Sequence, residues 1–362
     1  MDPDAASGPD TGDQDSAAQL CARVAEANSA GTPLRIAGGG TKAFYGHPVD
    51  APALDMTGHR GITHYDPVEL VVSVRAGTPL TELERTLAGS GQQLPFEPPH
   101  FGSAATVGGM VSTGLSGPRR PWSGAVRDFV LGTRLISHDG QHLRFGGEVM
   151  KNVAGYDLSR LVTGVQGTLG VITEVSLKVL PLPGAAHSLR LQLPLEAAMA
   201  KLAKWGRQPV PLTAAAWHDG GLYLRLEGGG RSVDANRARL GGETLDPDFW
   251  RQLREHELPF FDPADPRPLW RLSVPHTTSP LALEGDWLLD WAGAQRWLRS
   301  ELPASAIREA ATRAGGHATC YTPSAAEPFT PLGPVLAKYH RQVKARLDPK
   351  GIFNPGRLYR DL

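Results

Sequence analysis

Residues 35–46 read RIAGGGTKAFYG, a short apolar strand that runs directly into three consecutive glycines. Two more glycine-rich stretches follow in the same half of the chain, TVGGMVSTGLSG at residues 106–117 and TGVQGTLG at residues 163–170. Successive backbone N–H groups in such loops can converge on an anion, and missing β-carbons let a pyrophosphate approach closely. One such cluster usually marks a plain turn, but three within one domain favour a large phosphate-bearing ligand.

Two common nucleotide-binding motifs do not fit the first glycine run. A Walker A loop needs a lysine followed by serine or threonine, but Lys42 is followed by Ala43. A Rossmann fingerprint starting at Gly38 would open a helix, and residues 44–48 (FYGHP) cannot continue one. We therefore expect loops, rather than a dinucleotide-binding helix, to hold the ligand.

Longer motifs resemble a known family. RIAGGGTKAFYG, the PFEPP at residues 95–99 with the ATVGGMVSTGLSG that follows, and VMKNVAGYDLSRLVTGVQGTLGVITEVSLKVLP at residues 149–181 resemble the FAD domain of the vanillyl-alcohol oxidase and p-cresol methylhydroxylase (PCMH-type) superfamily. DPKGIFNPGRLY at residues 348–359 is similar to the C-terminal segment of its hydroxy-acid-oxidising branch. Nearly everything after the N-terminal tail is similar to the FAD-binding subunits of bacterial glycolate oxidases. The resemblance implies an α+β fold, with a two-subdomain PCMH-type FAD-binding domain and a smaller α/β cap domain.

The resemblance also implies a set of cofactor-binding residues. Gly38, Gly39, Gly40 and Thr41 would cradle the pyrophosphate, with Lys42 in the same loop. The other implied contacts are Thr106, Gly108, Gly109 and Ser112 along the flavin and pyrophosphate, and Gly167, Gly170, Val171 and Ile172 along the ribityl and adenine region. Relatives with covalently bound FAD place a histidine near the first glycine loop. Because Thr41 occupies that region and His47 comes one turn too late, we expect non-covalent FAD.

Composition changes along the chain indicate the domain organisation. The acidic residues 1–15 read as a disordered tail, and residues 16–183 as the FAD-binding domain. Seven of the eight tryptophans lie after residue 200, and we assign residues 184–325 to the cap and 326–362 to a segment that returns to the FAD domain. In the cap, strands alternate with helices, and one of the helices is expected at residues 295–300. This pattern indicates one mixed or antiparallel sheet with helices on one face.

Charge and cysteine content restrict the partners and the location. Lysine plus arginine equals aspartate plus glutamate at 37 each, so nothing favours nucleic acid or an acidic membrane surface. The two cysteines, Cys21 and Cys320, form no CxxC pair, so this chain cannot ligate an iron–sulfur cluster through thiolates. The N-terminus lacks the basic and apolar regions of a signal peptide. We expect a cytoplasmic protein, with any attachment to the inner membrane made through partner subunits.

Candidate catalytic residues are few. Lys151, near the turn at residues 155–157, could stabilise an anionic reduced flavin, although a surface lysine explains it equally well. His317 is the remaining candidate for a base, because the histidine-and-glutamate motifs of catalytic relatives are missing around it. We expect no metal site.

These observations lead to one expected function and two alternatives. The resemblance implies an FAD-dependent oxidoreductase subunit of a multisubunit 2-hydroxy acid (glycolate) oxidase or dehydrogenase, taking part in electron transfer from substrate oxidation. Its implied partners are a second, catalytic FAD subunit and an iron–sulfur subunit. A self-sufficient oxidase of a hydroxy acid or carbohydrate, and a non-redox subunit whose flavin only stabilises the assembly, stay open.

Overall fold

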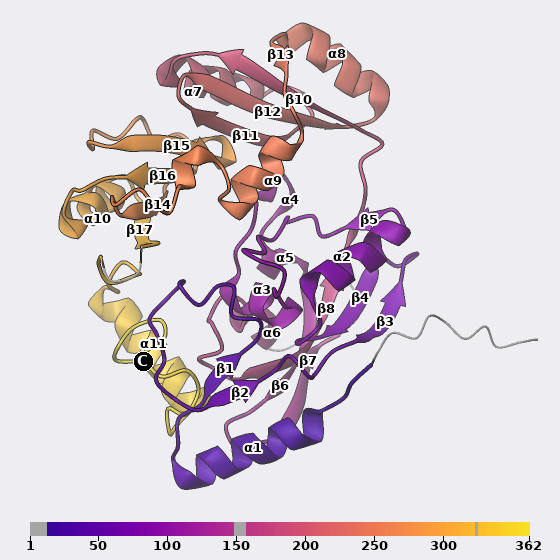
Figure 1. The fold of residues 1–362 in the computed structure, drawn as a ribbon, viewed down its shortest axis with the longest axis vertical. Coiled ribbons are helices and arrows are strands. Elements are labelled where there is room, and N and C mark those ends of the chain that lie inside the picture. Colours follow the sequence, from indigo (N-terminus) through magenta and orange to yellow (C-terminus); the bar gives the residue numbers. More distant parts are fainter. Residues whose placement is uncertain (1–12, 148–156, 323–324) are drawn as a thin grey trace, which may run out of the picture.

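The computed structural model describes residues 13–147, 157–322 and 325–362. Figure 1 shows a lower part that contains the N-terminal half of the chain and an upper part formed by a second sheet. Helix α11 (Pro334–Leu347) and the C-terminus lie beside the lower part, next to β1 (Arg35–Ala37) and β2 (Ala53–Asp55). Strands β1 and β2 pair in parallel. Since β1 ends at Ala37, the glycine run 38–40 begins directly after it.

The lower part is built on a five-stranded antiparallel sheet. Its strand order is β3-β4-β8-β6-β7, with bounds Ile62–Asp66, Val71–Arg75, Val171–Lys178, Val130–Ile136 and His142–Gly146. Strand β8 lies at the centre and is almost wholly buried, although its sequence VITEVSLK alternates apolar and polar residues. The core of this part also takes in helices α1 (Ala17–Ala30), α2 (Leu80–Gly89) and α3 (Val107–Thr113). Shorter elements are α4 (Arg120–Ser123), α5 (Val126–Phe129), α6 (Leu158–Leu161), β5 (Gln92–Gln93) and β9 (Leu180–Pro181).

Helix α1 follows from its sequence. Leu20, Val24 and Ala27 repeat at helical spacing and are buried, and the helix ends at Gly31, whose φ of 66° suits a residue without a β-carbon. Ser16 precedes the helix, but its side chain makes no capping bond; Asp15 Oδ1 instead accepts from Ala17 N at 2.9 Å.

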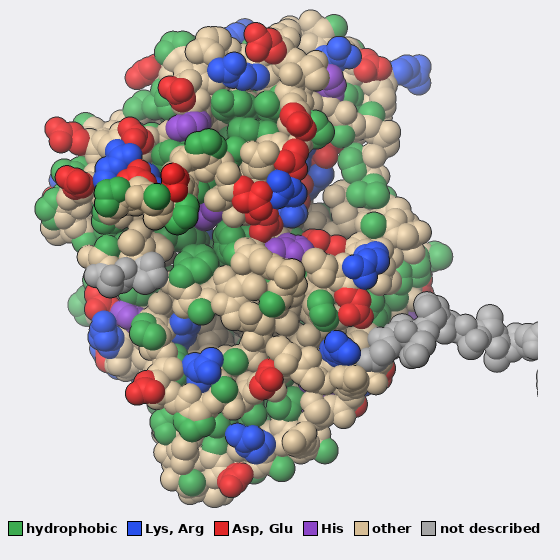
Figure 2. Space-filling view, viewed as in Figure 1, with side chains coloured by type: hydrophobic (Ala, Val, Ile, Leu, Met, Phe, Trp, Pro, Cys, Tyr) green, Lys and Arg blue, Asp and Glu red, His purple; other side chains and the backbone are tan. Residues whose placement is uncertain are grey.

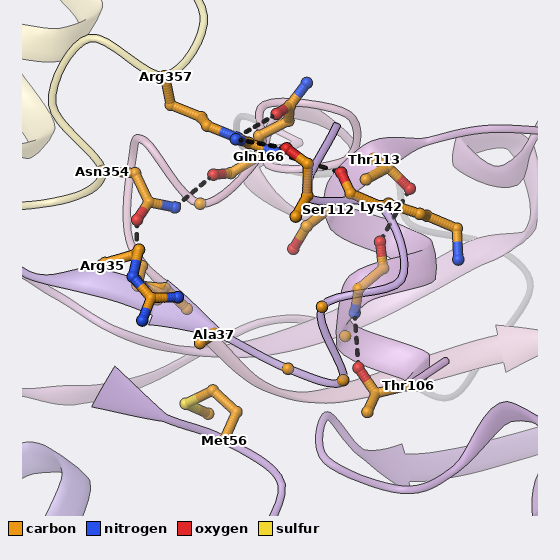
Figure 3. Close-up of a pocket in the computed structure, with 18 of the residues that line it drawn as sticks. Arg35, Ala37, Lys42, Met56, Thr106, Ser112, Thr113, Gln166, Asn354 and Arg357 are labelled. Atoms are coloured by element: carbon orange, nitrogen blue, oxygen red, sulfur yellow. Dashed lines mark hydrogen bonds between the residues drawn. The ribbon is translucent and has the colours of Figure 1, made fainter. Parts of the chain in front are cut away.

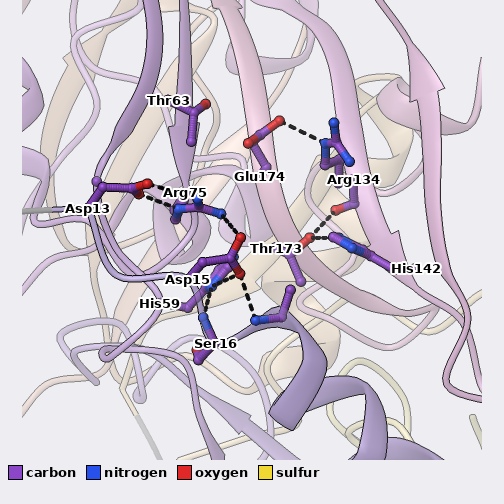
Figure 4. Close-up of polar contacts among 12 residues, drawn as sticks. Asp13, Asp15, Ser16, His59, Thr63, Arg75, Arg134, His142, Thr173 and Glu174 are labelled. Carbon is purple, nitrogen blue, oxygen red and sulfur yellow. Dashed lines mark hydrogen bonds and ion pairs between the residues drawn. The ribbon is translucent and has the colours of Figure 1, made fainter.

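The N-terminal tail is shorter than expected. Asp13 and Asp15 both pair with the Arg75 guanidinium, at 2.5 and 2.9 Å. Gln14 bridges to the backbone of Arg60, and Ser16 N donates to Nδ1 of the buried His59 (Figure 4). The prediction of a tail through residue 15 is therefore wrong for residues 13–15, because their carboxylates find a cation on β4.

The second part, here called the cap, is an eight-stranded sheet in residues 185–320. Its strand order is β13-β10-β12-β11-β15-β16-β14-β17, and every pairing is antiparallel. The strands are β10 (Ala185–Gln192), β11 (Leu212–His218), β12 (Gly221–Gly228), β13 (Glu243–Thr244), β14 (Leu269–Ser273), β15 (Asp286–Asp290), β16 (Gln295–Arg299) and β17 (His317–Cys320). The first four strands, with helices α7 (Leu195–Trp205) and α8 (Gly230–Leu240), have the split βαβ arrangement.

The expected helix at 295–300 is wrong, because this segment forms strand β16. β16 pairs with β14 on one side and β15 on the other, and all five of its residues are buried. A central strand covered on both faces shows no alternation of polar and apolar residues, so its pattern does not distinguish it from a short helix.

Helices lie on both faces of the cap sheet, so the expectation of helices on one face is wrong, because α9 covers the face that meets the lower part. Helices α7 and α8 pack with β10–β12, and α10 (Ala304–Arg313) packs with β14, β16 and β17. Helix α9 (Asp248–Glu255) lies on the opposite face, where its residues Trp250 and Leu253 pack with Ala214 and Ala216 of β11. The same cluster includes Tyr45 of the lower part, so α9 lies between the two parts.

Buried charges join the two parts. Glu97 of the lower part lies 2.8 Å from Arg225 on β12, and Arg119 lies 2.6 Å from Glu227 on the same strand. Glu255 of α9 accepts from the backbone N–H of His100 and Phe101. Surface charges are different in character, because Figure 2 shows basic and acidic side chains interspersed over the visible face.

Candidate cofactor site

The glycine-rich segments meet around one cavity of ≈ 340 Å³ in the lower part (Figure 3). It is bounded by β1 and the loop after it, by α3, by residues 166–172 and by the C-terminal segment. Twelve of the thirteen implied cofactor residues line it: Gly38, Gly39, Gly40, Thr41, Lys42, Thr106, Gly108, Gly109, Ser112, Gly167, Gly170 and Ile172. Val171 does not line it, because its side chain points into the hydrophobic core.

Two of the glycines show why the loop needs them. A β-carbon on Gly39 would lie 1.5 Å from the Ala104 carbonyl oxygen, so the loop could not pack against residue 104 with any side chain. Gly40 has a φ of +73°, which side chains disfavour, and open space around its Cα. Glycine thus serves both to bring the loop against its neighbour and to leave backbone exposed on the cavity side.

Thr106 has a structural role that the sequence did not reveal. Its hydroxyl oxygen accepts from Gly109 N at 3.2 Å and caps α3. The same oxygen lies 2.5 Å from where a Gly38 β-carbon would be. Thr106 therefore holds the first and second glycine segments together at the cavity wall.

The cavity has a positive lining. Arg35, Lys42 and Arg357 are its charged residues, and no acidic side chain is among the described residues that line it. Lys42 is 7% exposed, and its Nζ donates to the His100 carbonyl oxygen at 3.1 Å. Burial lowers the pKa of Lys42 to about 8, against the opposing attraction of Glu255. Among the described residues no carboxylate forms an ion pair with Lys42, so its buried charge is complementary to a phosphate anion.

Residues 354–357 complete the site, and the sequence reasoning did not assign them a contact. Asn354 accepts from Ile36 N at 2.8 Å and donates to the Gln166 carbonyl oxygen at 2.7 Å. Arg357 donates to carbonyl oxygens of the loop at residues 42, 43, 45 and 47 and to Gln166 Oε1. The motif FNPGRLY was the available signal, but nothing local in it shows which loop its side chains reach.

The other candidates lie elsewhere. Lys151 falls outside the described residues. His317 is exposed on β17 and does not line the cavity. His47 lies 2.8 Å from Glu327 and is not a lining residue either. Among the described residues, no group of three or more His, Cys, Asp or Glu side chains is arranged to hold a metal ion.

A second, much smaller space of ≈ 20 Å³ lies between the lower part and the cap. Its walls include Phe101 and, from the cap, His256, Arg271, Asp290 and Tyr321. The His256 ring stacks on Phe261 at 4.1 Å, and burial and the charge of Arg271 lower its pKa to about 3. Burial raises the pKa of Asp290 to about 7. Aromatic packing therefore leaves little free volume between the two parts.

Comparison with known proteins agrees with the site. Residues 14–146 match the model of the FAD binding domain family. The chain is 54% identical over 343 residues to the glycolate oxidase subunit GlcE of Escherichia coli, covering 95% of this chain and 97% of that protein. It is also 34% identical over 128 residues to the glycolate oxidase subunit GlcD of Bacillus subtilis, covering 35% of this chain and 27% of that protein.

A solved structure of an alkyldihydroxyacetonephosphate synthase has the same fold. It superposes with a TM-score of 0.66 at 17% identity, covering 94% of this chain and 75% of that one. The α+β prediction with a PCMH-type domain is thus confirmed. No helix formed by the described residues has the length and apolar character needed to cross a membrane. With this identity over nearly its whole length, the chain belongs to the family of the glycolate oxidase subunit GlcE and carries an FAD-binding domain.

Proposed function

We propose that this chain is the FAD-binding subunit of a multisubunit glycolate oxidase and transfers electrons released by substrate oxidation. The observation that carries the proposal is the glycine-lined, positively charged cavity, in a chain 54% identical to such a subunit over almost its full length. When bound, FAD supplies a two-electron acceptor that can release electrons singly. The expected partners of this chain are a GlcD-type FAD subunit and a separate iron–sulfur subunit.

The residues present fit FAD. The Gly38–Gly40 backbone and Lys42 would hold the pyrophosphate, because they combine exposed N–H groups with an unpaired cation. Lys42 would also keep positive charge at this end of the cavity below a pH of about 8. No histidine is among the described residues that line the cavity, and His47 instead lies against Glu327. This supports non-covalent binding of FAD.

Loss of the loop tests the proposal. Gly39→Ala forces the loop off residue 104, whereas Gly58→Ala has nothing within 4 Å of the added β-carbon and is the matched control. In the complex expressed with both partner subunits, Gly39→Ala but not Gly58→Ala should remove this chain's share of the flavin, leaving that of the GlcD-type subunit, and should lower glycolate-dependent dye reduction. A wild-type chain that is free of flavin after gentle purification with its partners would contradict the proposal.

One observation favours the second candidate, a self-sufficient oxidase. Arg271 and Asp290 line the small space between the two parts, and a carboxyl group with a pKa of about 7 could accept a proton. Anaerobic mixing of the isolated, FAD-loaded chain with glycolate or D-lactate separates the candidates. Rapid bleaching of the flavin absorption would establish a substrate site in this chain, and bleaching that requires the GlcD-type partner supports the electron-transfer role.

A further inference from the structure

Helix α11 buries little of its surface against the rest of the protein. Lys344 is the only buried residue of the fourteen in this helix. Figure 1 shows α11 at the outer edge of the lower part, beside the C-terminus. Surface helices normally turn an apolar stripe toward the core. In α11 a lysine takes the core-facing position instead.

The apolar side chains of α11 face outward. Val335, Leu336 and Tyr339 are 67%, 57% and 58% exposed. Val335 and Lys344 lie about two and a half turns apart at 3.6 residues per turn, so they point in opposite directions. Tyr339 follows Val335 by one turn and therefore lies on the same side. We call Val335, Leu336 and Tyr339 the outer stripe.

The outer stripe has a basic rim. The helix sequence PVLAKYHRQVKARL contains four lysines and arginines and no aspartate or glutamate, although the whole chain has a net charge of zero. Two of these four cations pair with carboxylates of the C-terminal segment. The other two, Lys338 and Arg346, are exposed, and no described carboxylate pairs with either. Lys338 lies three residues after Val335 and Arg346 seven after Tyr339, so both flank the outer stripe.

The inner side of α11 is attached to the wall of the cofactor cavity. Lys344 Nζ donates to the carbonyl oxygens of Thr168 at 2.7 Å and Phe353 at 2.8 Å. Thr168 belongs to the third glycine segment, and Asn354, which follows Phe353, lines the cavity. A protein bound to the outer stripe would therefore be separated from this wall by one helix, about 10 Å across.

The charge of α11 favours an acidic protein surface over other occupants of the outer stripe. A second copy related by a two-fold axis would place one basic helix against another, which like-charge repulsion opposes. Anionic membranes are bound by clusters of about four to eight basic residues, whereas only Lys338 and Arg346 flank the stripe without a described carboxylate partner. A protein groove that is apolar at its centre and carries carboxylates at its rim complements both features.

We propose that the outer stripe is the docking surface for the GlcD-type FAD subunit, which binds it through an apolar groove rimmed by carboxylates. The inference rests on the proposed function. Under that function the GlcD-type subunit supplies the electrons that this chain accepts, so its surface has to come close to this cofactor cavity. Helix α11 is exposed on one side and lies against the cavity wall on the other.

Charge substitutions on α11 test the proposal. Tyr339→Glu should weaken binding of the GlcD-type subunit at least tenfold, because it places a charge in an apolar interface. The double variant Lys338→Glu/Arg346→Glu should do the same, because it reverses the charge of the rim. Val68→Glu is the matched control, since Val68 is 88% exposed between β3 and β4, on the other side of the lower part from α11. FAD affinity and melting temperature of the isolated variants should stay at wild-type values, because these side chains do not line the cavity and are exposed.

The measurement is a titration of the tagged, FAD-loaded chain with the full-length GlcD-type subunit, beside the subunit composition of the coexpressed complex. Affinity of the wild-type chain should fall as salt concentration rises, because the rim charges are exposed. Wild-type affinity in Tyr339→Glu, loss of the iron–sulfur subunit alone, or loss only of binding to phosphatidylglycerol vesicles would overturn the proposal. A wild-type chain that binds no FAD, or that copurifies with neither partner, would instead overturn the proposed function.

Discussion

Replacing Arg357 with methionine should damage both stability and cofactor binding. The Arg357 guanidinium donates to the carbonyl oxygens of His47 at 2.6 Å, Tyr45 at 2.7 Å and Ala43 at 3.1 Å, and to Gln166 Oε1 at 2.8 Å. Methionine retains the apolar part of the side chain but none of these bonds. The loop that carries Lys42 then loses its attachment to the C-terminal segment.

A fifth bond, to the Lys42 carbonyl oxygen, is longer at 3.3 Å, so the size of the effect is worked from the four shorter bonds. Each contributes on the order of 1 kcal/mol net, because the loop carbonyls can partly exchange Arg357 for water. We therefore expect the free energy of unfolding to fall by about 3–4 kcal/mol. FAD affinity should fall at least tenfold, because a displaced loop no longer presents residues 40–43 to the cavity.

Urea unfolding of the ligand-free chain and fluorescence titration with FAD measure the two effects. Arg360→Met is the matched control, because Arg360 is exposed and its one ion pair among the described residues is with the half-exposed Glu327. It should change unfolding by less than about 1 kcal/mol. If Arg357→Met unfolds within 1 kcal/mol of wild type (roughly the control's range) and binds FAD normally, the reasoning about the C-terminal segment is wrong.

Three further predictions concern charges. Glu97→Gln should destabilise the chain by about 3 kcal/mol at pH 7, because it leaves Arg225 buried beside one acid fewer. Burial alone would raise the pKa of Glu97, but Arg225 and Arg119 hold this pKa below its ordinary value. The stabilisation by Glu97 is therefore complete above about pH 4.5 and is lost as pH falls through the folded pKa. Urea unfolding should show the free energies of unfolding of wild type and Glu97→Gln converging in acid. Lys42→Met should weaken FAD binding and abolish the decline in wild-type affinity expected as pH rises through about 8, with a flavin titration at pH 6–9 as the measurement. Asp290→Asn should raise the melting temperature above pH 7, because burial raises the folded pKa of Asp290 from about 3.8 to about 7 and the folded protein therefore loses stability as pH rises between these values. A variant that melts like wild type at pH 9 would contradict a destabilising buried charge at Asp290, whose oxygens accept only from Trp291 N and Gln295 Nε2 among the described residues.

The sequence alone indicated a large phosphate-bearing ligand, and its family resemblance implied FAD and twelve of the residues that line the cavity. The run of glycines 38–40 is visible in the sequence because the loop requires it. Gly39 packs against the backbone of residue 104 with no room for a β-carbon, and Gly40 has a positive φ that other residues disfavour. The three glycine segments could therefore be assigned to one ligand before their positions were known. The helical periodicity of α1 and the alternation of apolar and polar residues in β8 likewise indicate those elements locally.

Only the tertiary structure decided what depends on distant segments meeting. Residues 295–299 form strand β16 rather than the expected helix because β14, from a separate segment, pairs with one side of it while the preceding strand β15 pairs with the other. Residues 13–15 pack against the lower part because Asp13 and Asp15 form ion pairs with Arg75 of β4. Gln166 and Arg357 are 191 positions apart, and no local pattern encodes a contact of that range. Their pairing exists only because the C-terminal segment folds back onto the glycine loop.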